Sequence, residues 1–247
     1  MKNNIAYHTD QLARYFSTNR VTWQQFYESE RTVIEQLHPD YSQTILDVGC
    51  GGLGLALRDE FGVVNYTGVE INSEAADAAR KMNSEAHIYC GDILRLVKDE
   101  LREKSYSVVF SLSCIDWNVQ FNDMLAAVWS CVQPGGSLVA TFRLTAGEGC
   151  DDISRSYQYI NFDGEMKGEK ASYVVLNANT LIQQLNSFDP SAINAYGYWG
   201  TPSSTAVTPY ERFCFSAFSV RKRKDDDADV IHYGLNLPSE ILDSVNQ

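Results

Sequence analysis

Short apolar runs and helix-like patterns alternate along residues 44–144. The apolar runs have the length of single strands, and each of the first four is followed by a stretch with helical spacing or high helix propensity. The predicted strands are 44–48, 65–70, 87–90, 106–112 and 137–144, and the predicted helices are 53–61, 73–82, 92–103 and 121–131. This order is typical of a doubly wound α/β fold, in which helices cover both faces of a mostly parallel sheet.

The alternation stops after residue 144. Residues 157–160 and 171–175 have the pattern of two strands around a glycine-rich connection, which predicts an inserted β-hairpin after the fifth strand. A helix from Asn179 and two last strands, at 193–199 and 212–220, complete an expected sheet of seven strands. Three roles are open for the insertion: an acceptor-binding module, a cover for the sheet edge, or a dimer contact.

The two ends of the chain differ in character from its centre. Apolar residues at helical spacing predict a helix from Thr22 to Leu37, which ends at His38-Pro39 and covers the sheet. We expect an N-terminal helical lid over 1–40, an α/β domain over 41–220 with the insertion at about 145–178, and a charged linker and C-terminal tail over 221–247. The tail is expected to dock on the core or on a second subunit, so a homodimer is one expected assembly.

Composition narrows the expected partners. The net charge of −12 and the pI near 4.7 disfavour a broad phosphate-binding surface, so no nucleic-acid partner is expected. The six cysteines lack C-x-x-C or Cys/His ligand spacing, which predicts buried free thiols and no metal site. Because no apolar run has the length of a signal sequence or a membrane span, we expect a cytoplasmic protein without a membrane partner.

The centre of the predicted site is the stretch from Thr44 to Gly54, a buried strand that runs into a glycine turn and the start of a helix. Gly49, Gly51 and Gly54 satisfy the pattern G-x-G-x-x-G, which lets the backbone approach a ligand with free N–H groups. Asp47 stands two residues before the first glycine. A polar or anionic part of a ligand is therefore expected at this turn.

Two further acids follow at the ends of later strands. Glu70 ends the second strand about 20 residues on, where a carboxylate can accept hydrogen bonds from two ribose hydroxyls. The third strand runs into Gly91-Asp92-Ile93. This series resembles the class I S-adenosylmethionine-dependent methyltransferases, over about residues 41–145, and implies a Rossmann-like methyltransferase sheet with S-adenosyl-L-methionine as cofactor.

The resemblance also implies roles for single residues. Asp47, Gly49 and Gly51 would hold the methionine end of the cofactor, Glu70 the ribose hydroxyls, Asp92 with Ile93 the adenine, and Ser111 the amino-acid end, with Cys50 and Ile71 beside them and Tyr15 and Trp23 reaching over from the lid. A purely structural alternative is that Asp47 accepts hydrogen bonds from the N–H groups of the turn and that Asp92 caps a helix.

Catalysis is expected in the loop after the fourth strand. Methyl transfer from a sulfonium requires alignment of the acceptor and, for a hydroxyl acceptor, removal of a proton. Asp116 and His8 are the polar candidates for that proton, although Asp116 fits an ordinary loop acid equally well, while Trp117 and Tyr15 would exclude water. We expect a small hydroxylated or amino acceptor, a metabolite or a sugar-like molecule, with O- and N-methylation both open.

Two other functional classes fit part of the pattern. A catalytically silent Rossmann subunit of a larger assembly could bind the cofactor or another nucleotide through the same residues. An NAD-dependent oxidoreductase would use the same glycine pattern, but Asp47 and the Gly91-Asp92 pair argue against it.

Overall fold

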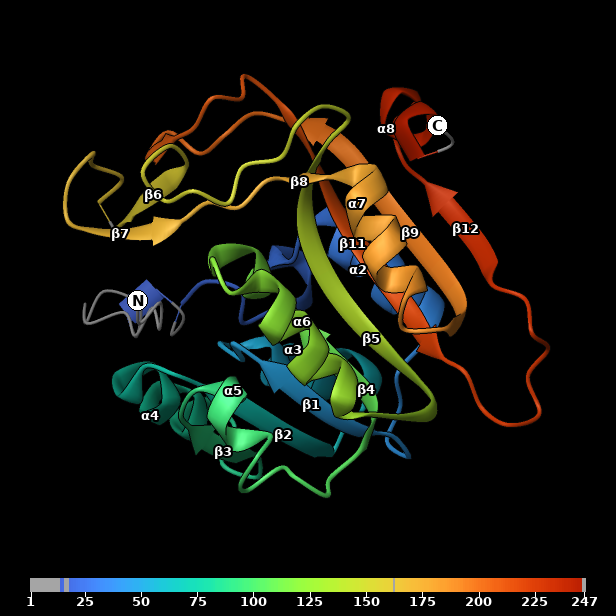
Figure 1. Ribbon diagram of the computed structural model, residues 1–247. Helices are drawn as coiled ribbons and strands as arrows, with labels where there is room; N and C mark the ends of the chain where they lie inside the picture. The colour runs from blue at the N-terminus through green and yellow to red at the C-terminus, as the bar shows by residue number, and fades with distance from the viewer. Residues whose placement is uncertain (1–13, 16–17, 162, 246–247) are drawn as a thin grey trace.

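A nine-stranded sheet forms the centre of the protein (Figure 1), for which a computed structural model describes residues 14–15, 18–161 and 163–245. From one edge to the other its strands are β12 (His232–Asn236), β9 (Pro190–Gly200), β11 (Phe213–Lys222), β5 (Val132–Thr145), β4 (Tyr106–Ser111), β1 (Thr44–Val48), β2 (Asn65–Glu70) and β3 (His87–Cys90), and the short β8 (Leu176–Asn177) pairs with β5. Only β11 is antiparallel to its neighbours β5 and β9, so the sheet is mostly parallel, as expected.

The sequence-based count of seven strands is wrong. The first additional strand is β12, from the tail, which pairs parallel with β9 and forms an edge of the sheet. Four of its five residues are exposed, so it lacks the apolar alternation that marks a strand in sequence. The second is β8, whose two residues are too short to give any pattern.

Helices cover both faces of the sheet (Figure 1), which confirms the doubly wound α/β fold. The helical segments are η1 (Trp23–Gln25), α2 (Glu28–Leu37), α3 (Leu53–Phe61), α4 (Ser73–Met82), α5 (Ile93–Leu96), η2 (Ile115–Trp117), α6 (Phe121–Ser130), α7 (Ala178–Asn186) and α8 (Ser239–Val245). The first four share one apolar core with the sheet, and α5 to α8 share the core on the opposite face.

Two predicted helices differ from those in the structure. The stretch predicted as one helix from Thr22 is divided into η1 and α2, because Phe26 and Tyr27 have extended backbones and Tyr27 N–H donates to Glu30 Oε2 at 2.9 Å. The helix predicted over 92–103 is α-helical only in α5, after which a chain of turns follows.

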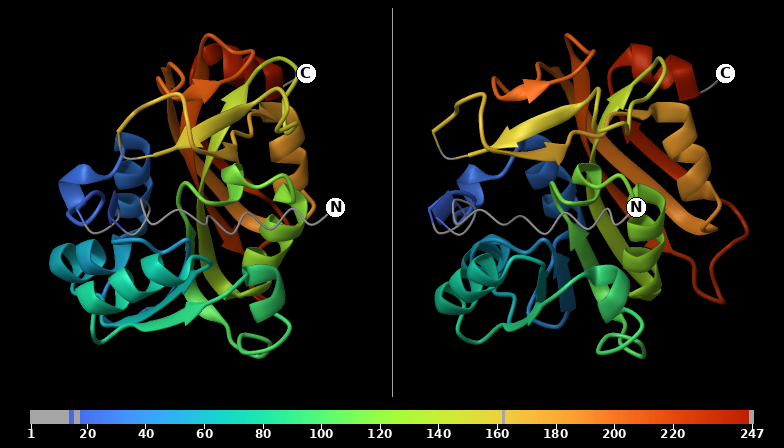
Figure 2. Two further views of the ribbon diagram at one scale, coloured as in Figure 1. Left: turned by 90° about the vertical axis from the view of Figure 1, so that its left-hand side faces the viewer. Right: turned by 60° about the vertical axis from the view of Figure 1, so that its left-hand side comes forward.

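The insertion after β5 forms a second, smaller sheet. Its strands β6 (Tyr157–Ile160) and β7 (Glu169–Ser172) pair antiparallel, and β10 (Ala206–Val207), from a distant part of the sequence, pairs with β6. The unit is therefore a three-stranded sheet and not an isolated hairpin. Both views of Figure 2 show β6 and β7 projecting from the main sheet on the same side as the N-terminal segment, drawn in blue.

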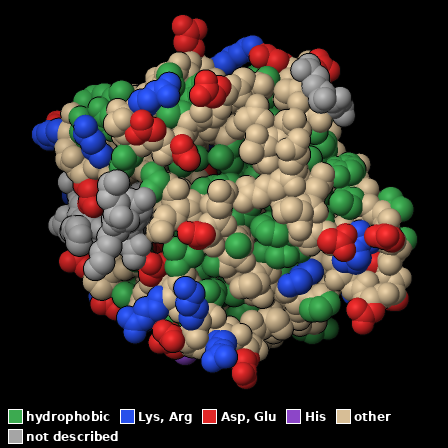
Figure 3. All heavy atoms as spheres, in the orientation of Figure 1, with side chains coloured by type: hydrophobic (Ala, Val, Ile, Leu, Met, Phe, Trp, Pro, Cys, Tyr) green, Lys and Arg blue, Asp and Glu red, His purple; other side chains and the backbone are tan. Residues whose placement is uncertain are grey.

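The surface agrees with the mixed charge of the sequence. On the face shown in Figure 3, basic side chains lie in small groups among acidic ones and do not form one continuous patch. None of the helices in the described part of the chain has the length and apolar character needed to cross a membrane.

Candidate functional site

A cavity of about 640 Å³ opens at the carboxyl ends of β1, β2 and β4. Residues from the glycine turn, the loop after β4 and the N-terminal segment form its walls, and the small sheet with residues 201–205 completes them. This is where open α/β sheets bind ligands, and the volume lies within the range of small-molecule sites.

The glycine turn between β1 and α3 tolerates no side chain. Gly49 and Gly51 have positive φ angles of 78° and 40°. A Cβ atom on Gly49 would lie 2.8 Å from Cys114 Sγ, and one on Gly52 would lie 2.7 Å from the carbonyl oxygen of Arg20. The turn is therefore packed between the loop after β4 and the N-terminal segment, and its backbone is free to approach a ligand.

Asp47, at the end of β1, is buried and hydrogen-bonded. Its Oδ2 atom accepts a hydrogen bond from Tyr66 Oη at 2.5 Å. Burial raises the pKa of the Asp47 carboxyl to about 8, although Tyr66 and the positive charge of Arg20 oppose the rise. The carboxyl is thus poised to lose its proton near neutral pH when a cation is bound beside it.

The acids after β2 and β3 also reach the cavity. Glu70 Oε1 accepts a hydrogen bond from the backbone N–H of Asn72 at 3.0 Å, and burial raises the pKa of the Glu70 carboxyl. Asp92 Oδ1 accepts from Leu94 N–H at 3.0 Å and caps α5. The structural role considered for Asp92 is therefore present, and the residue lines the cavity as well.

Most of the predicted site residues line this one cavity. They are Tyr15, Asp47, Gly49, Cys50, Gly51, Glu70, Ile71, Asp92, Ile93 and Asp116. Two others do not: Trp23 packs in the core, edge-on to Phe61 at 5.0 Å between ring centroids, and Ser111 is fully buried within β4. The Trp23 ring belongs to the core on one face of the sheet, and Ser111 is buried without lining the cavity. His8 lies outside the described residues.

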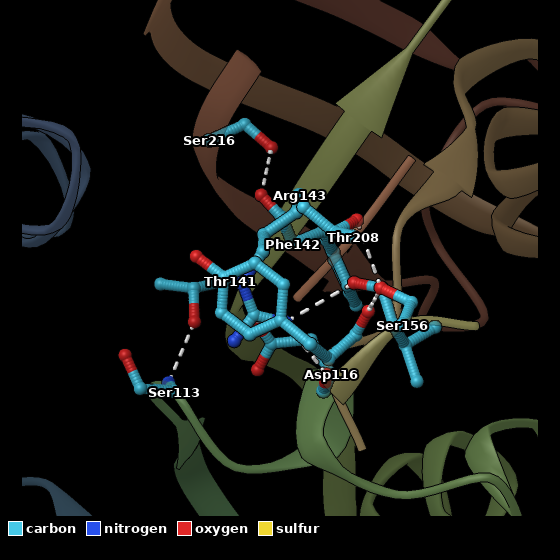
Figure 4. A network of polar contacts seen from close by, with 10 residues as sticks. Ser113, Asp116, Thr141, Phe142, Arg143, Ser156, Thr208 and Ser216 are labelled. Carbon is cyan, nitrogen blue, oxygen red and sulfur yellow. Dashed lines mark hydrogen bonds and ion pairs between the residues drawn. The ribbon is translucent and has the colours of Figure 1, made fainter. Parts of the chain in front are cut away.

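Asp116, in η2, forms a buried ion pair with Arg143 of β5 (Figure 4). Arg143 Nη1 lies 3.2 Å from Asp116 Oδ2 and donates to the backbone carbonyls of Asp116 at 2.8 Å and Val174 at 3.1 Å. Both side chains are about 5% exposed or less. Burial raises the pKa of the Asp116 carboxyl, and the charge of Arg143 opposes that rise.

Aromatic rings enclose this ion pair. The Arg143 guanidinium lies 3.8 Å from the centroid of Tyr173 and 4.5 Å from that of Trp117. Tyr173 follows β7, so Arg143 connects the loop after β4 to the insertion. Arg143 was not predicted as a site residue. Its local signal in the sequence is a charged residue within the apolar strand 137–144.

A second ion pair lies within the N-terminal segment, beside the cavity. Arg20 Nη2 lies 2.8 Å from Glu30 Oε1, and the Arg20 guanidinium lies 4.6 Å from the Phe26 ring centroid. Tyr27 stacks on Phe215 of β11 at 6.4 Å between centroids. Arg20 and Tyr27 also line the cavity and were not predicted, because neither has a signal in the local sequence.

Comparison with known proteins supports the resemblance found in the sequence. Residues 46–140 match the family model of the methyltransferase domain. No curated protein matches the sequence. An S-adenosylmethionine-dependent methyltransferase from Methanosarcina mazei superposes with a TM-score of 0.58 and 14% identity, over 81% of this chain and 99% of that one.

Two further solved structures share the fold. The 1,6-didemethyltoxoflavin-N1-methyltransferase from Burkholderia thailandensis, with bound S-adenosylhomocysteine, has a TM-score of 0.53 and 16% identity over 87% of this chain and 80% of its own. The [4+2]-cyclase SpnF has a TM-score of 0.54 and 14% identity over 83% and 84%. The fold alone therefore does not determine the reaction. Residues 46–140 thus match a methyltransferase domain, and the chain shares the fold of solved S-adenosylmethionine-dependent methyltransferases.

Proposed function

We propose that this protein binds S-adenosyl-L-methionine along the carboxyl ends of β1, β2 and β3 and transfers its methyl group to a small acceptor. One observation carries the proposal: Asp47, Glu70 and Asp92, from three successive strand ends, line the same cavity beside the glycine turn. The space is large enough for a nucleoside and an acceptor together.

The residues present fit this cofactor. Gly49 and Gly51 let the backbone approach its amino-acid end, since a Cβ on Gly49 would collide with Cys114. Glu70 offers a buried carboxyl group to a pair of ribose hydroxyls, and its Oε1 atom also accepts a hydrogen bond from Asn72 N–H. When bound, the cofactor supplies an activated methyl group on a sulfonium leaving group. The chain's own tasks are to orient the acceptor, exclude water and remove a proton where one is present.

The acceptor is proposed to lie between the N-terminal segment, the loop after β4 and the insertion. If the cofactor occupies the first three strand ends, the cavity surface that is left belongs to Asp116, Trp117, Tyr173 and the residues around them. Asp116 is the described candidate for proton removal, because it lines the cavity and burial raises the pKa of its carboxyl. A small hydroxylated or amino molecule suits this enclosure, and both O- and N-methylation stay within the proposal.

The wider expectations about partners remain part of the same proposal. The acidic charge favours a small molecule over a nucleic acid, and a cytoplasmic protein without a membrane partner fits the same composition. A homodimer remains an expected assembly of the chain.

Parallel calorimetric titrations with S-adenosylhomocysteine and NAD test the cofactor assignment. We expect saturable binding of S-adenosylhomocysteine with one site per chain and no heat of binding for NAD. Binding of NAD alone would indicate an oxidoreductase. A third outcome is a protein that binds S-adenosylhomocysteine but forms none of it from S-adenosylmethionine with any of a broad panel of hydroxyl and amine acceptors. That result would indicate a silent binding subunit or a catalyst of another reaction.

A further inference from the structure

Arg143 is a buried cation in the wall of the cavity. A buried arginine beside a ligand cavity ordinarily indicates a binding site for phosphate or carboxylate. Here its Nη1 atom is directed at Asp116 Oδ2 and at two backbone carbonyls, and aromatic rings lie within 4.5 Å of the guanidinium carbon. Its charge is therefore already balanced inside the protein.

Among the described residues that line the cavity, no other cation lacks an acidic partner. In the described part of the wall the second cation is Arg20, which is paired with Glu30 at 2.8 Å. The same wall contains four carboxyl groups in addition to these two arginines. Those acids are Asp47, Glu70, Asp92 and Asp116. An anionic acceptor would thus meet no cation in the described wall that lacks an acidic partner.

Asp116 has an oxygen atom that the protein leaves unused. Oδ2 faces Arg143, whereas Oδ1 is buried and has no hydrogen-bond partner among the described residues. A buried carboxylate oxygen without a partner is unfavourable, so such atoms are rare unless a ligand satisfies them. Trp117 Nε1, in the adjacent residue, is also buried without a partner.

We infer that the Asp116–Arg143 pair forms the acceptor subsite of the cavity. The pair selects an uncharged or cationic molecule that donates an N–H or O–H to Asp116 Oδ1. It excludes molecules that carry a free phosphate or carboxylate. Arg143 is a positioning residue in this subsite. It orients Asp116, and it does not bind an anion. This inference rests on the proposed function, because it assigns the cofactor to the other end of the cavity.

The remaining lining of the subsite is consistent with this chemistry. Apart from Arg20, Asp47, Glu70, Asp92, Asp116 and Arg143, the described side chains that line the cavity carry no charge, and they include aromatic rings, hydroxyls and amides. The two rings that contact Arg143 are those of Trp117 and Tyr173, and both residues line the cavity. Rings supply flat apolar surfaces, and the hydroxyls and amides offer hydrogen bonds to a polar neutral molecule.

Three matched probes test the inference without knowledge of the natural acceptor. Benzylamine, benzyl alcohol and benzoate share one ring and differ in charge and in hydrogen-bond donors. Their binding to the full chain is measured by ligand-observed NMR, with S-adenosylhomocysteine present in excess. We expect benzylamine and benzyl alcohol to bind about tenfold or more tightly than benzoate, because a hydrogen bond to a charged carboxylate contributes that much.

The Asp116→Asn variant keeps the shape of the side chain but leaves the Arg143 charge unbalanced. In this variant we expect the order to reverse in favour of benzoate, and in the exposed control Asp99→Asn we expect the wild-type order. The inference is contradicted if the wild type binds the three probes with equal affinity or binds none of them. It is also contradicted if the wild type binds benzoate more tightly than the other two probes. An unchanged order in Asp116→Asn also contradicts it.

The outcome is separable from that of the proposed function. The probe measurement requires no methyl transfer and can be repeated without S-adenosylhomocysteine. A wild type that ranks the probes as expected but fails to bind S-adenosylhomocysteine would overturn the proposed function and leave the subsite in place. Folding of the Asp116→Asn variant is checked by its far-UV circular dichroism and its thermal unfolding, compared with those of the wild type and of Asp99→Asn.

Discussion

Tyr66 reaches Asp47 because Gly54 has no side chain. The phenol of Tyr66, on β2, donates to Asp47 Oδ2 on β1 at 2.5 Å, and a Cβ atom on Gly54 of α3 would lie 2.6 Å from the Tyr66 ring. The third glycine of the G-x-G-x-x-G pattern therefore makes room for the ring that holds the first acid of the site. The glycine pattern and the acid before it are thus one structural unit.

The first prediction concerns the pH dependence of cofactor binding. Since the Asp47 carboxyl has a pKa of about 8 and a bound ammonium group favours its charged form, affinity for S-adenosylhomocysteine should rise with pH. Between pH 6 and pH 8 we expect a gain of about tenfold or more, with proton release on binding. Calorimetry in buffers of different ionisation enthalpy measures both. The Asp47→Asn variant should show neither, and a flat profile in the wild type would contradict the role of Asp47.

The same carboxyl makes a prediction for stability. Its pKa is about 8 in the folded protein, whereas an unfolded aspartate has a pKa of about 3.9. Between these values the folded state binds the extra proton, so the Asp47 contribution to the free energy of unfolding decreases as pH rises. The stability of Asp47→Asn relative to the wild type should increase by up to about 1.4 kcal/mol per pH unit over that window. Urea titrations at several pH values measure this difference, and a constant offset would show that Asp47 is charged in the free protein.

Gly54→Ala should destabilise the protein by about 1–3 kcal/mol, because the new methyl group displaces the Tyr66 ring. It should also weaken S-adenosylhomocysteine binding, since Asp47 loses its hydrogen-bond donor. The matched control is Gly147→Ala, where the nearest neighbour of an added Cβ is Thr145 Oγ1 at 3.8 Å. Thermal unfolding of both variants checks the prediction, and equal losses would indicate that the glycine at 54 serves only backbone flexibility.

Glu70→Ala should weaken S-adenosylhomocysteine binding by about 1–3 kcal/mol, because ribose hydroxyls would lose hydrogen bonds to a charged carboxylate. Glu74→Ala, an exposed acid in the first turn of α4, is the control for the loss of one negative charge and should bind normally. Titration calorimetry compares the three proteins. Wild-type affinity in Glu70→Ala would remove this residue from the cofactor site.

Asp116→Asn should lower the turnover number by about 100-fold or more once an acceptor is identified, while affinity for S-adenosylhomocysteine stays the same. The reason is that the amide cannot remove a proton, although it retains the size of the carboxyl. Arg143→Lys should fall between this variant and the wild type, since it keeps the charge but loses the fixed geometry that orients Asp116. Full turnover of Asp116→Asn would leave alignment of the acceptor as the source of catalysis.

The sequence by itself determined which residues meet at the proposed cofactor end of the cavity. Each strand, its following turn and the acid at its end are local in sequence, and parallel strands bring their carboxyl ends to one edge of a sheet. Asp47, Glu70 and Asp92 could therefore be placed together without coordinates, and the cavity contains all three. The doubly wound, mostly parallel architecture followed from the same alternation of strands and helices.

Only the tertiary structure decided which residues meet at the proposed acceptor end. Asp116 and Arg143 are 27 residues apart, and Tyr173 joins them from an insertion whose third strand, β10, comes from a still more distant segment. Local patterns carry no information on these contacts, because they depend on the direction of single side chains and on pairings between distant segments. The same reason explains why Trp23, at a helical position typical of a lid, points into the core, and why β12 joins the sheet as an edge strand with mostly exposed side chains.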